Sequence, residues 1–173
     1  MAVLSTAVVY RFGLNITAGG FFCFSAALLV VIVIDLRHQI IPDMISLPGI
    51  VIGFVLSFFS PLISWLDSLM GILCGGGVLY TIALLYFFLR KQEGMGGGDI
   101  KLLAMIGAFL GWPGVAVTLA AAAAAGAAAA AGLLAARRID LQARLPFGLF
   151  LALGGLVALF AGPALVARYA SLL

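Results

Sequence analysis

The chain has 173 residues, of which 65% are hydrophobic and 9% are charged, and its mean hydropathy is +1.31. A soluble globular domain carries about 25% charged residues, so this composition excludes a protein whose whole surface faces water. The net charge of +3 indicates no nucleic-acid partner, because the basic residues lie in short connections between apolar runs.

The apolar runs predict an all-α fold, a polytopic membrane bundle of about six transmembrane helices preceded by a partial N-terminal helix. A spanning helix needs about 20 mostly apolar residues, and in the N-terminal segment 1–16 the residues before Gly13 are too few to provide one. We expect residues 17–173 to form a single membrane-embedded domain. Its segments are predicted at about 17–35, 44–59, 68–89, 100–112, from the turn at 111–114 to 136, and 146–168.

Lysine and arginine placement predicts the orientation, because cytoplasmic connections carry an excess of these residues. Only Arg11 and Arg168 fall on one side of the predicted bundle. Seven basic residues fall on the other side: Arg37, Arg90, Lys91, Lys101, Arg137, Arg138 and Arg144. We expect this second side to face the cytoplasm.

Six acidic residues are present, and three of them lie in predicted loops, where a solvated surface charge is the simplest interpretation: Asp67, Glu93 and Asp140. In contrast, Asp35 follows the uninterrupted apolar run 28–34, and Asp99 opens the fourth segment. An ionisable group at the edge of a membrane segment is costly unless it meets water or a partner, so both are candidates for function. The alternative is a helix-capping role or pairing with Arg37 or Lys101.

The approach to Asp99 is rich in glycine, with four glycines in residues 94–98. Such backbone can turn tightly and lie close to another chain. The predicted helix that follows is about 20 Å long, shorter than the hydrocarbon core of about 30 Å. Irregular backbone at membrane depth is tolerated only where protein buries it or a water-filled cavity receives it. A cavity with water, a carboxylate and open backbone is what peptide hydrolysis inside a membrane requires.

The stretch after Asp35 is predicted to leave the helix. Pro42 disfavours a continuous helix, so we expect a turn on the cytoplasmic side, with Asp43 as the N-cap of the next segment. No metal site or cofactor is expected, because the only histidine has no partner at ligand spacing and the two cysteines lie within apolar runs.

Two motifs resemble those of the type IV prepilin peptidases. The first, at residues 35–43, is an aspartate followed by a basic loop that ends in Ile-Pro-Asp. The second, at residues 96–102, matches Gly-x-Gly-Asp-x-Lys-Leu. The surroundings at 93–95, 103–108 and 146–148 are also similar to the family, so the resemblance covers nearly the whole chain.

The resemblance implies a metal-independent aspartic endopeptidase of the bacterial inner membrane, which removes the short basic leader of prepilins and pseudopilins. It implies that Asp35 and Asp99 are the catalytic pair, on the cytoplasmic side. Four further residues match motif positions that would bind substrate or support the motif: Asp43, Gly96, Gly98 and Lys101. The expected partners are the prepilin substrate and the lipid bilayer.

One departure concerns a second activity of the family. Bifunctional members carry an N-terminal cytoplasmic region with paired Cys-x-x-Cys motifs, and they also methylate the new N-terminus. This chain has no such cysteines. We therefore expect either a short-form peptidase or a truncated one, and we do not expect methyltransferase activity.

Two carboxylates in one site do not both ionise readily. The ionised one would act as general base on a water, and the protonated one would polarise the scissile carbonyl. Two alternatives from other classes stay open. A small transporter or proton relay would use the same aspartates but would favour carboxylates spread across the membrane, and a structural subunit of a secretion or pilus system would not need them. A presenilin-like protease shares Gly-x-Gly-Asp, but the Ile-Pro-Asp ending argues against it.

Overall fold

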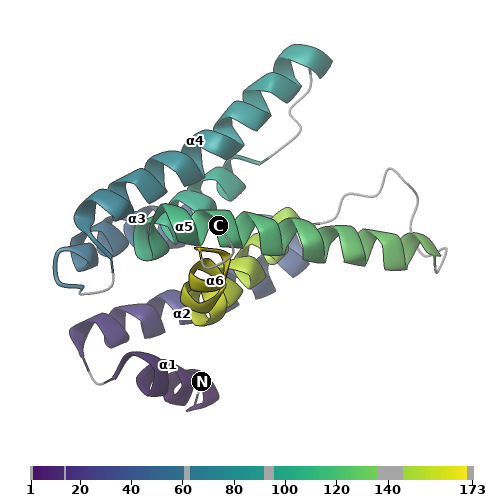
Figure 1. Cartoon of the computed structure of the whole chain (residues 1–173). Coiled ribbons are helices and arrows are strands. Elements are labelled where there is room, and N and C mark those ends of the chain that lie inside the picture. The colour runs from purple at the N-terminus through teal and green to yellow at the C-terminus, as the bar shows by residue number, and fades with distance from the viewer. Residues whose placement is uncertain (1, 14, 61–62, 92–95, 136–145, 171–173) are drawn as a thin grey trace.

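The computed structural model describes residues 2–13, 15–60, 63–91, 96–135 and 146–170. Within these ranges it contains helices and no strands, as Figure 1 shows. The helices are α1 (Ala2–Phe12), α2 (Ile16–His38), α3 (Asp43–Ser57), α4 (Trp65–Arg90), α5 (Gly97–Ala135) and α6 (Phe147–Ala170).

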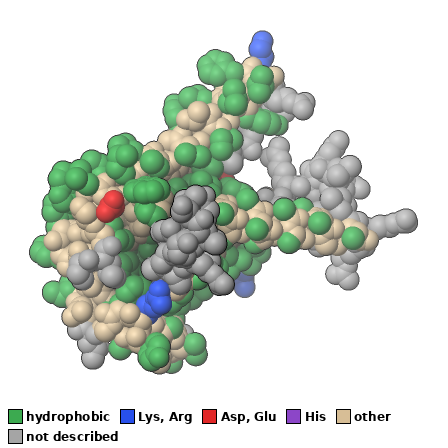
Figure 2. Space-filling model, viewed as in Figure 1, with side chains coloured by type: hydrophobic (Ala, Val, Ile, Leu, Met, Phe, Trp, Pro, Cys, Tyr) green, Lys and Arg blue, Asp and Glu red, His purple; other side chains and the backbone are tan. Residues whose placement is uncertain are grey.

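Three of these helices are long and apolar enough to cross a membrane: α2, Trp65–Leu89 of α4, and Gly97–Gly132 of α5. Shorter apolar helices cover Ala2–Phe12, Asp43–Ser57 and Phe147–Gly162. Large apolar side chains such as Val51, Leu73 and Phe88 are exposed, and Figure 2 shows hydrophobic side chains over most of the face in view. In a bilayer these side chains face lipid. The prediction of an all-α membrane bundle is confirmed.

The predicted fourth and fifth segments lie within α5, which is interrupted at one residue. Gly111 has φ 68° and ψ −179°, a conformation that glycine adopts without the steric cost that a side chain would bring. Pro113 then lies near the start of the second half, where its fixed φ suits a helix. The turn is therefore shorter than the four residues predicted.

Two other boundaries differ from the prediction. α2 continues through Asp35 to His38, so this aspartate lies one turn inside the helix and not at its end. Helix α5 starts at Gly97, so part of the glycine run is helical. The division of the chain at residue 16 stays a prediction.

α4 and the first half of α5 pack backbone against backbone. Gly71 and Gly107 leave no room for a side chain on either helix, and a Cβ at Gly75 would lie 2.6 Å from the Leu103 carbonyl oxygen. The Ser68 hydroxyl, which is buried, donates a hydrogen bond of 2.7 Å to the Ala108 carbonyl. Small residues at four-residue spacing allow this close approach in membrane helices.

α6 packs on α5 and α2 through two adjacent glycines. A Cβ at Gly154 would lie 2.5 Å from the Thr118 carbonyl oxygen, in the second half of α5. A Cβ at Gly155 would lie 3.1 Å from Ile106 and 3.2 Å from Leu28. α6 is thus held against both neighbours, and this packing places its first turn beside the end of α2.

The α4–α5 contact predicts a specific sensitivity to added side-chain volume. We expect Gly71→Ala to destabilise the protein by about 1–3 kcal/mol, the usual cost of overpacking, because its methyl group would meet the Gly107 backbone. Gly77→Ala on the same helix is the matched control, since a Cβ there meets nothing within 4 Å. Thermal unfolding in detergent measures both, and equal midpoints for the two variants would contradict the packing.

Candidate functional site

Asp35 points inward from the last part of α2. Asp35 is 4% exposed and is one of the few buried polar or charged residues in the described part of the chain. The helix ends just beyond it, where Gln39 takes a left-handed conformation (φ 53°) and its N–H donates to the Asp35 carbonyl oxygen at 3.0 Å. The side chain is therefore fixed at the end of a rigid helix and is not carried by the loop.

The first turn of α6 meets the Asp35 side chain directly. The backbone N–H of Leu149 donates a hydrogen bond of 2.6 Å to Asp35 Oδ2. The first N–H groups of a helix have no intrahelical acceptor, and this end of a helix carries partial positive charge. Gly148 makes the approach possible, because a Cβ there would lie 2.9 Å from the same oxygen.

Asp99 lies in the first turn of α5, and its N–H donates to the Gly96 carbonyl oxygen at 3.2 Å. Its side chain is partly buried, and its carboxyl group interacts electrostatically with that of Asp35. Two carboxyl groups that are 64 positions apart in sequence (99 − 35) thus belong to one site.

Ile41 fills the space between the two helix starts that carry this site. The residue is 8% exposed. A Cβ at Gly98 would lie 2.9 Å from Ile41 Cβ, and a Cβ at Gly148 would lie 2.8 Å from Ile41 Cδ1. One side chain from the α2–α3 connection therefore sets the separation of α5 from α6, and glycine is needed on each side of it.

An ion pair joins α3 to α5 beside the carboxylates. Lys101 Nζ donates to both oxygens of Asp43, at 2.8 and 2.7 Å, and the side chains are 38% and 56% exposed. An exposed pair of this kind contributes about 0–1 kcal/mol. The prediction of Asp43 as an N-cap is wrong by one residue, because Pro42 occupies that position and Asp43 begins the helix.

Of the residues predicted for the site, Asp35, Asp99 and Gly98 lie together, with the Asp43–Lys101 pair beside them. Gly96 is exposed, and a Cβ there would meet nothing within 4 Å. Several residues of the predicted loops lie outside the described residues: Glu93, Gly94, Met95, Arg137, Arg138, Asp140 and Arg144.

Sequence reasoning missed three contributors to the site. Gly148 and Ile41 were part of family-like stretches but were given no role, and the Leu149 N–H is a backbone group that no residue type reveals. The tight contacts of Gly98 and Gly148 with Ile41 become visible only when the three segments are folded together.

No group of three or more His, Cys, Asp or Glu side chains in the described part of the chain could hold a metal ion. The expectation of a metal-independent site stays a prediction.

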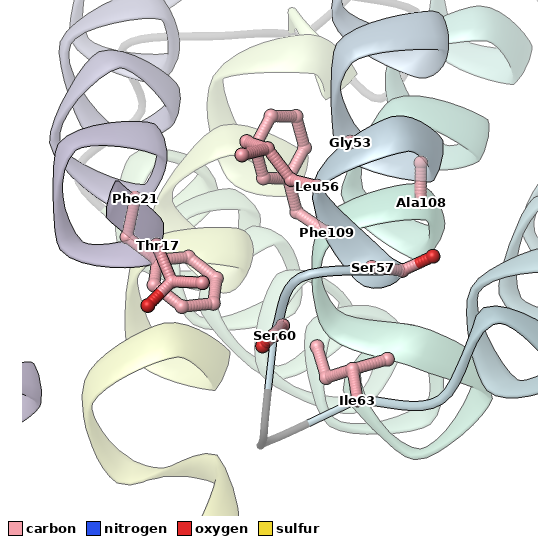
Figure 3. Close-up of a pocket in the computed structure, with 9 residues that line it drawn as sticks. All are labelled: Thr17, Phe21, Gly53, Leu56, Ser57, Ser60, Ile63, Ala108 and Phe109. Atoms are coloured by element: carbon pink, nitrogen blue, oxygen red, sulfur yellow. The ribbon is translucent and has the colours of Figure 1, made fainter. Parts of the chain in front are cut away.

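The pocket in Figure 3 is at a different place in the bundle. It has an empty volume of about 260 Å³, and residues from α2, α3, α5 and the α3–α4 connection line it, among them Thr17, Ser57 and Phe109. Thr17 and Asp35 are 18 positions apart on α2 (35 − 17), about 27 Å along the axis at 1.5 Å per residue. This pocket is not part of the carboxylate site.

A buried carboxylate coupled to a second, more accessible one can move protons. One member can accept a proton while the other donates one, because the two groups titrate as a pair. Such an arrangement suits hydrolysis by an activated water.

Residues 22–131 match the type IV leader peptidase family. The chain is 34% identical over 167 residues to a prepilin leader peptidase/N-methyltransferase of Stutzerimonas stutzeri. The aligned region covers 96% of this chain and 58% of that protein. Proteins of the same name from Pseudomonas aeruginosa and Xanthomonas campestris pv. campestris are 34% and 35% identical over 168 residues, with 97% of this chain and 58% of each covered. The chain thus spans little more than half the length of these relatives. No solved structure matches it.

The contact of Ile41 with Gly98 predicts a cross-link. In a variant with Cys23→Ala and Cys74→Ala, we expect Ile41→Cys and Gly98→Cys to form a disulfide, because the two Cβ positions are 2.9 Å apart and reach the usual range of about 3.5–4.5 Å when they separate by about 0.6 Å. The pair Ile41→Cys with Gly77→Cys is the control. Mobility on a non-reducing gel after proteolysis between the sites measures the link, and equal linking of both pairs would contradict the site geometry.

Proposed function

The chain belongs to the type IV leader peptidase family, and from this premise we propose that it is an intramembrane aspartic endopeptidase that removes the basic leader of type IV prepilins or pseudopilins. The observation that carries the proposal is the convergence of Asp35 and Asp99 at one end of an apolar bundle, because Ile41 lies against both Gly98, the neighbour of Asp99, and Gly148, whose backbone lies against Asp35. The relatives that bear the name prepilin leader peptidase support the substrate class.

The chemistry follows from the pair. A single proton is shared between two neighbouring carboxyl groups, because ionising both is electrostatically costly. The ionised group removes a proton from a water as that water attacks the scissile carbonyl, and the protonated group donates to the carbonyl oxygen. Neither step calls for a metal ion.

The placement of the site also fits a leader peptidase. The α2–α3 connection and the starts of α5 and α6 meet there, and the neighbouring connections hold most of the basic residues, which favours a cytoplasmic face of the inner membrane. A basic leader would stay in the cytoplasm while the apolar helix of the substrate stays in lipid. The open backbone at Gly96 gives room for an extended peptide.

The alternatives are less well supported. A transporter or proton relay favours carboxylates distributed across the membrane, whereas Asp35 and Asp99 share one end of the bundle. A structural subunit has no use for a buried carboxylate, which is costly in lipid. The names of the relatives also include an N-methyltransferase, and peptidase activity is the part that we propose for this chain.

Removal of either catalytic carboxylate should abolish cleavage. We expect Asp35→Asn and Asp99→Asn each to lower the rate of prepilin cleavage by at least about a hundredfold, the scale of general acid–base catalysis, while the protein still inserts and folds. Asp67→Asn is the control, because this residue lies beside Gly111, away from the pair. Cleavage rates measured in liposomes test this prediction, and full activity of Asp35→Asn or Asp99→Asn would contradict the proposal.

Chelation should leave the activity unchanged. Because the proposed chemistry uses two carboxyl groups and a water, we expect the same cleavage rate before and after dialysis against EDTA. A loss of activity that is restored by a divalent cation would refute the metal-independent mechanism.

A further inference from the structure

The geometry points to different roles for the carboxyl groups of Asp35 and Asp99. We propose that Asp35 is the general base and Asp99 the general acid, and that the first turn of α6 sets these roles through the Leu149 N–H. The inference rests on the proposed peptidase function and deepens it, because it assigns a role to each carboxylate and identifies Leu149 and Gly148 as positioning residues.

The hydrogen bond to Asp35 favours the ionised form of this carboxyl group. Its N···O distance of 2.6 Å is just below the range of about 2.7–2.9 Å for a charge-assisted hydrogen bond from a nitrogen donor. A donor that faces a carboxylate favours the charged form over the neutral one. The partial positive charge at the start of α6 acts in the same sense.

Asp99 has a different environment. Both carboxyl groups lie at a helix start, α6 for Asp35 and α5 for Asp99, so this feature alone does not separate them. The Leu149 N–H does separate the two carboxyl groups, because it bonds to Asp35, whereas no backbone N–H in the described part of the chain bonds to the Asp99 side chain. Asp99 is therefore the member that keeps the proton.

Gly148 shows that the contact is built into the fold. A Cβ at this position would lie 2.9 Å from Asp35 Oδ2, 3.0 Å from Asp35 Cγ and 2.8 Å from Ile41 Cδ1. Any larger residue would push α6 away from Asp35, and the Leu149 donor would move with it. Ile41 supports the arrangement from the other side.

The remaining charged groups near Asp35 do not reverse this asymmetry. The side chains described for α6 include no charged one, and the exposed side chains of Arg37 and His38 follow Asp35 on its own helix. On the other elements packed at this end, Lys101 of α5 is engaged with Asp43 of α3. The Leu149 N–H therefore distinguishes the two carboxyl groups.

The two carboxyl groups exchange protons with the water and the peptide in turn. Asp35 takes a proton from water, the water oxygen bonds to the scissile carbonyl carbon, and Asp99 gives its proton to the carbonyl oxygen, which yields a diol. Asp35 then returns its proton to the leaving nitrogen as the C–N bond breaks, and a diol hydroxyl returns a proton to Asp99. The products are an acid and an amine, and both carboxyl groups regain their starting states.

The test removes one N–H and measures the pH dependence of cleavage. Incorporation of the α-hydroxy analogue of leucine at position 149 replaces the amide N–H with an ester oxygen and keeps the side chain. We expect the acidic limb of the kcat/KM profile for a purified type IV prepilin to move up by about one pH unit, with the alkaline limb unmoved. The acidic limb reports the ionisation of Asp35, which becomes harder when the donor is lost. The alkaline limb reports the ionisation of Asp99, and it is unchanged because Asp35 is charged both before and after that step.

The matched control replaces Phe147 with its α-hydroxy analogue, because the Phe147 N–H belongs to the same helical turn. Both limbs of its kcat/KM profile should stay in place, since the bond to Asp35 comes from Leu149. Gly148→Ala displaces the same donor by ordinary mutagenesis, because its Cβ would lie 2.9 Å from Asp35 Oδ2, so it serves if the ester protein does not fold. A shift of the alkaline limb in either variant would assign the base to Asp99. Unmoved limbs would refute the role of α6, and absence of cleavage by the unmodified chain would refute the proposed function itself.

Discussion

The central constraint on this protein is the cost of a carboxylate in an apolar bundle. Asp35 lies one turn inside α2 and is almost completely buried, so its oxygens need a partner that lipid does not offer. The start of α6 supplies one, through the Leu149 N–H. The other features of the site follow from holding these two elements together while Asp99 is kept close by.

Close packing at glycines holds these helices together. α4 and α5 approach each other at Gly71 and Gly107, and α6 approaches its neighbours at Gly154 and Gly155. These contacts fix the helix axes, and Ile41 then sets the spacing of the two helix starts. The same small residues that allow close packing in a membrane therefore determine where the carboxyl groups lie.

The sequence predicted the parts of this arrangement that hydropathy and residue type determine. Apolar runs located the helices, and Asp35 and Asp99 were conspicuous because they border such runs. The turn at Gly111 was predicted over four residues, whereas a single positive φ is sufficient for it. Asp43 was displaced from its predicted capping role because Pro42 occupies the N-cap.

Contacts between distant segments were beyond the sequence. Gly148 is one of 22 glycines, and nothing local to it indicates that its missing side chain makes room for Asp35. The Leu149 donor is part of the backbone and has no signature in residue type. Both follow from the tertiary packing of α6 on α2, which a single sequence does not specify.

The most direct measurement of the central claim is the mass of the products formed when the reconstituted chain meets a prepilin in water enriched in ¹⁸O. The account predicts two fragments separated at the leader boundary, with one ¹⁸O in the new carboxyl terminus of the leader, because water attacks the scissile carbonyl. An unchanged prepilin mass, or cleavage that persists when both aspartates are replaced by asparagine, would contradict it.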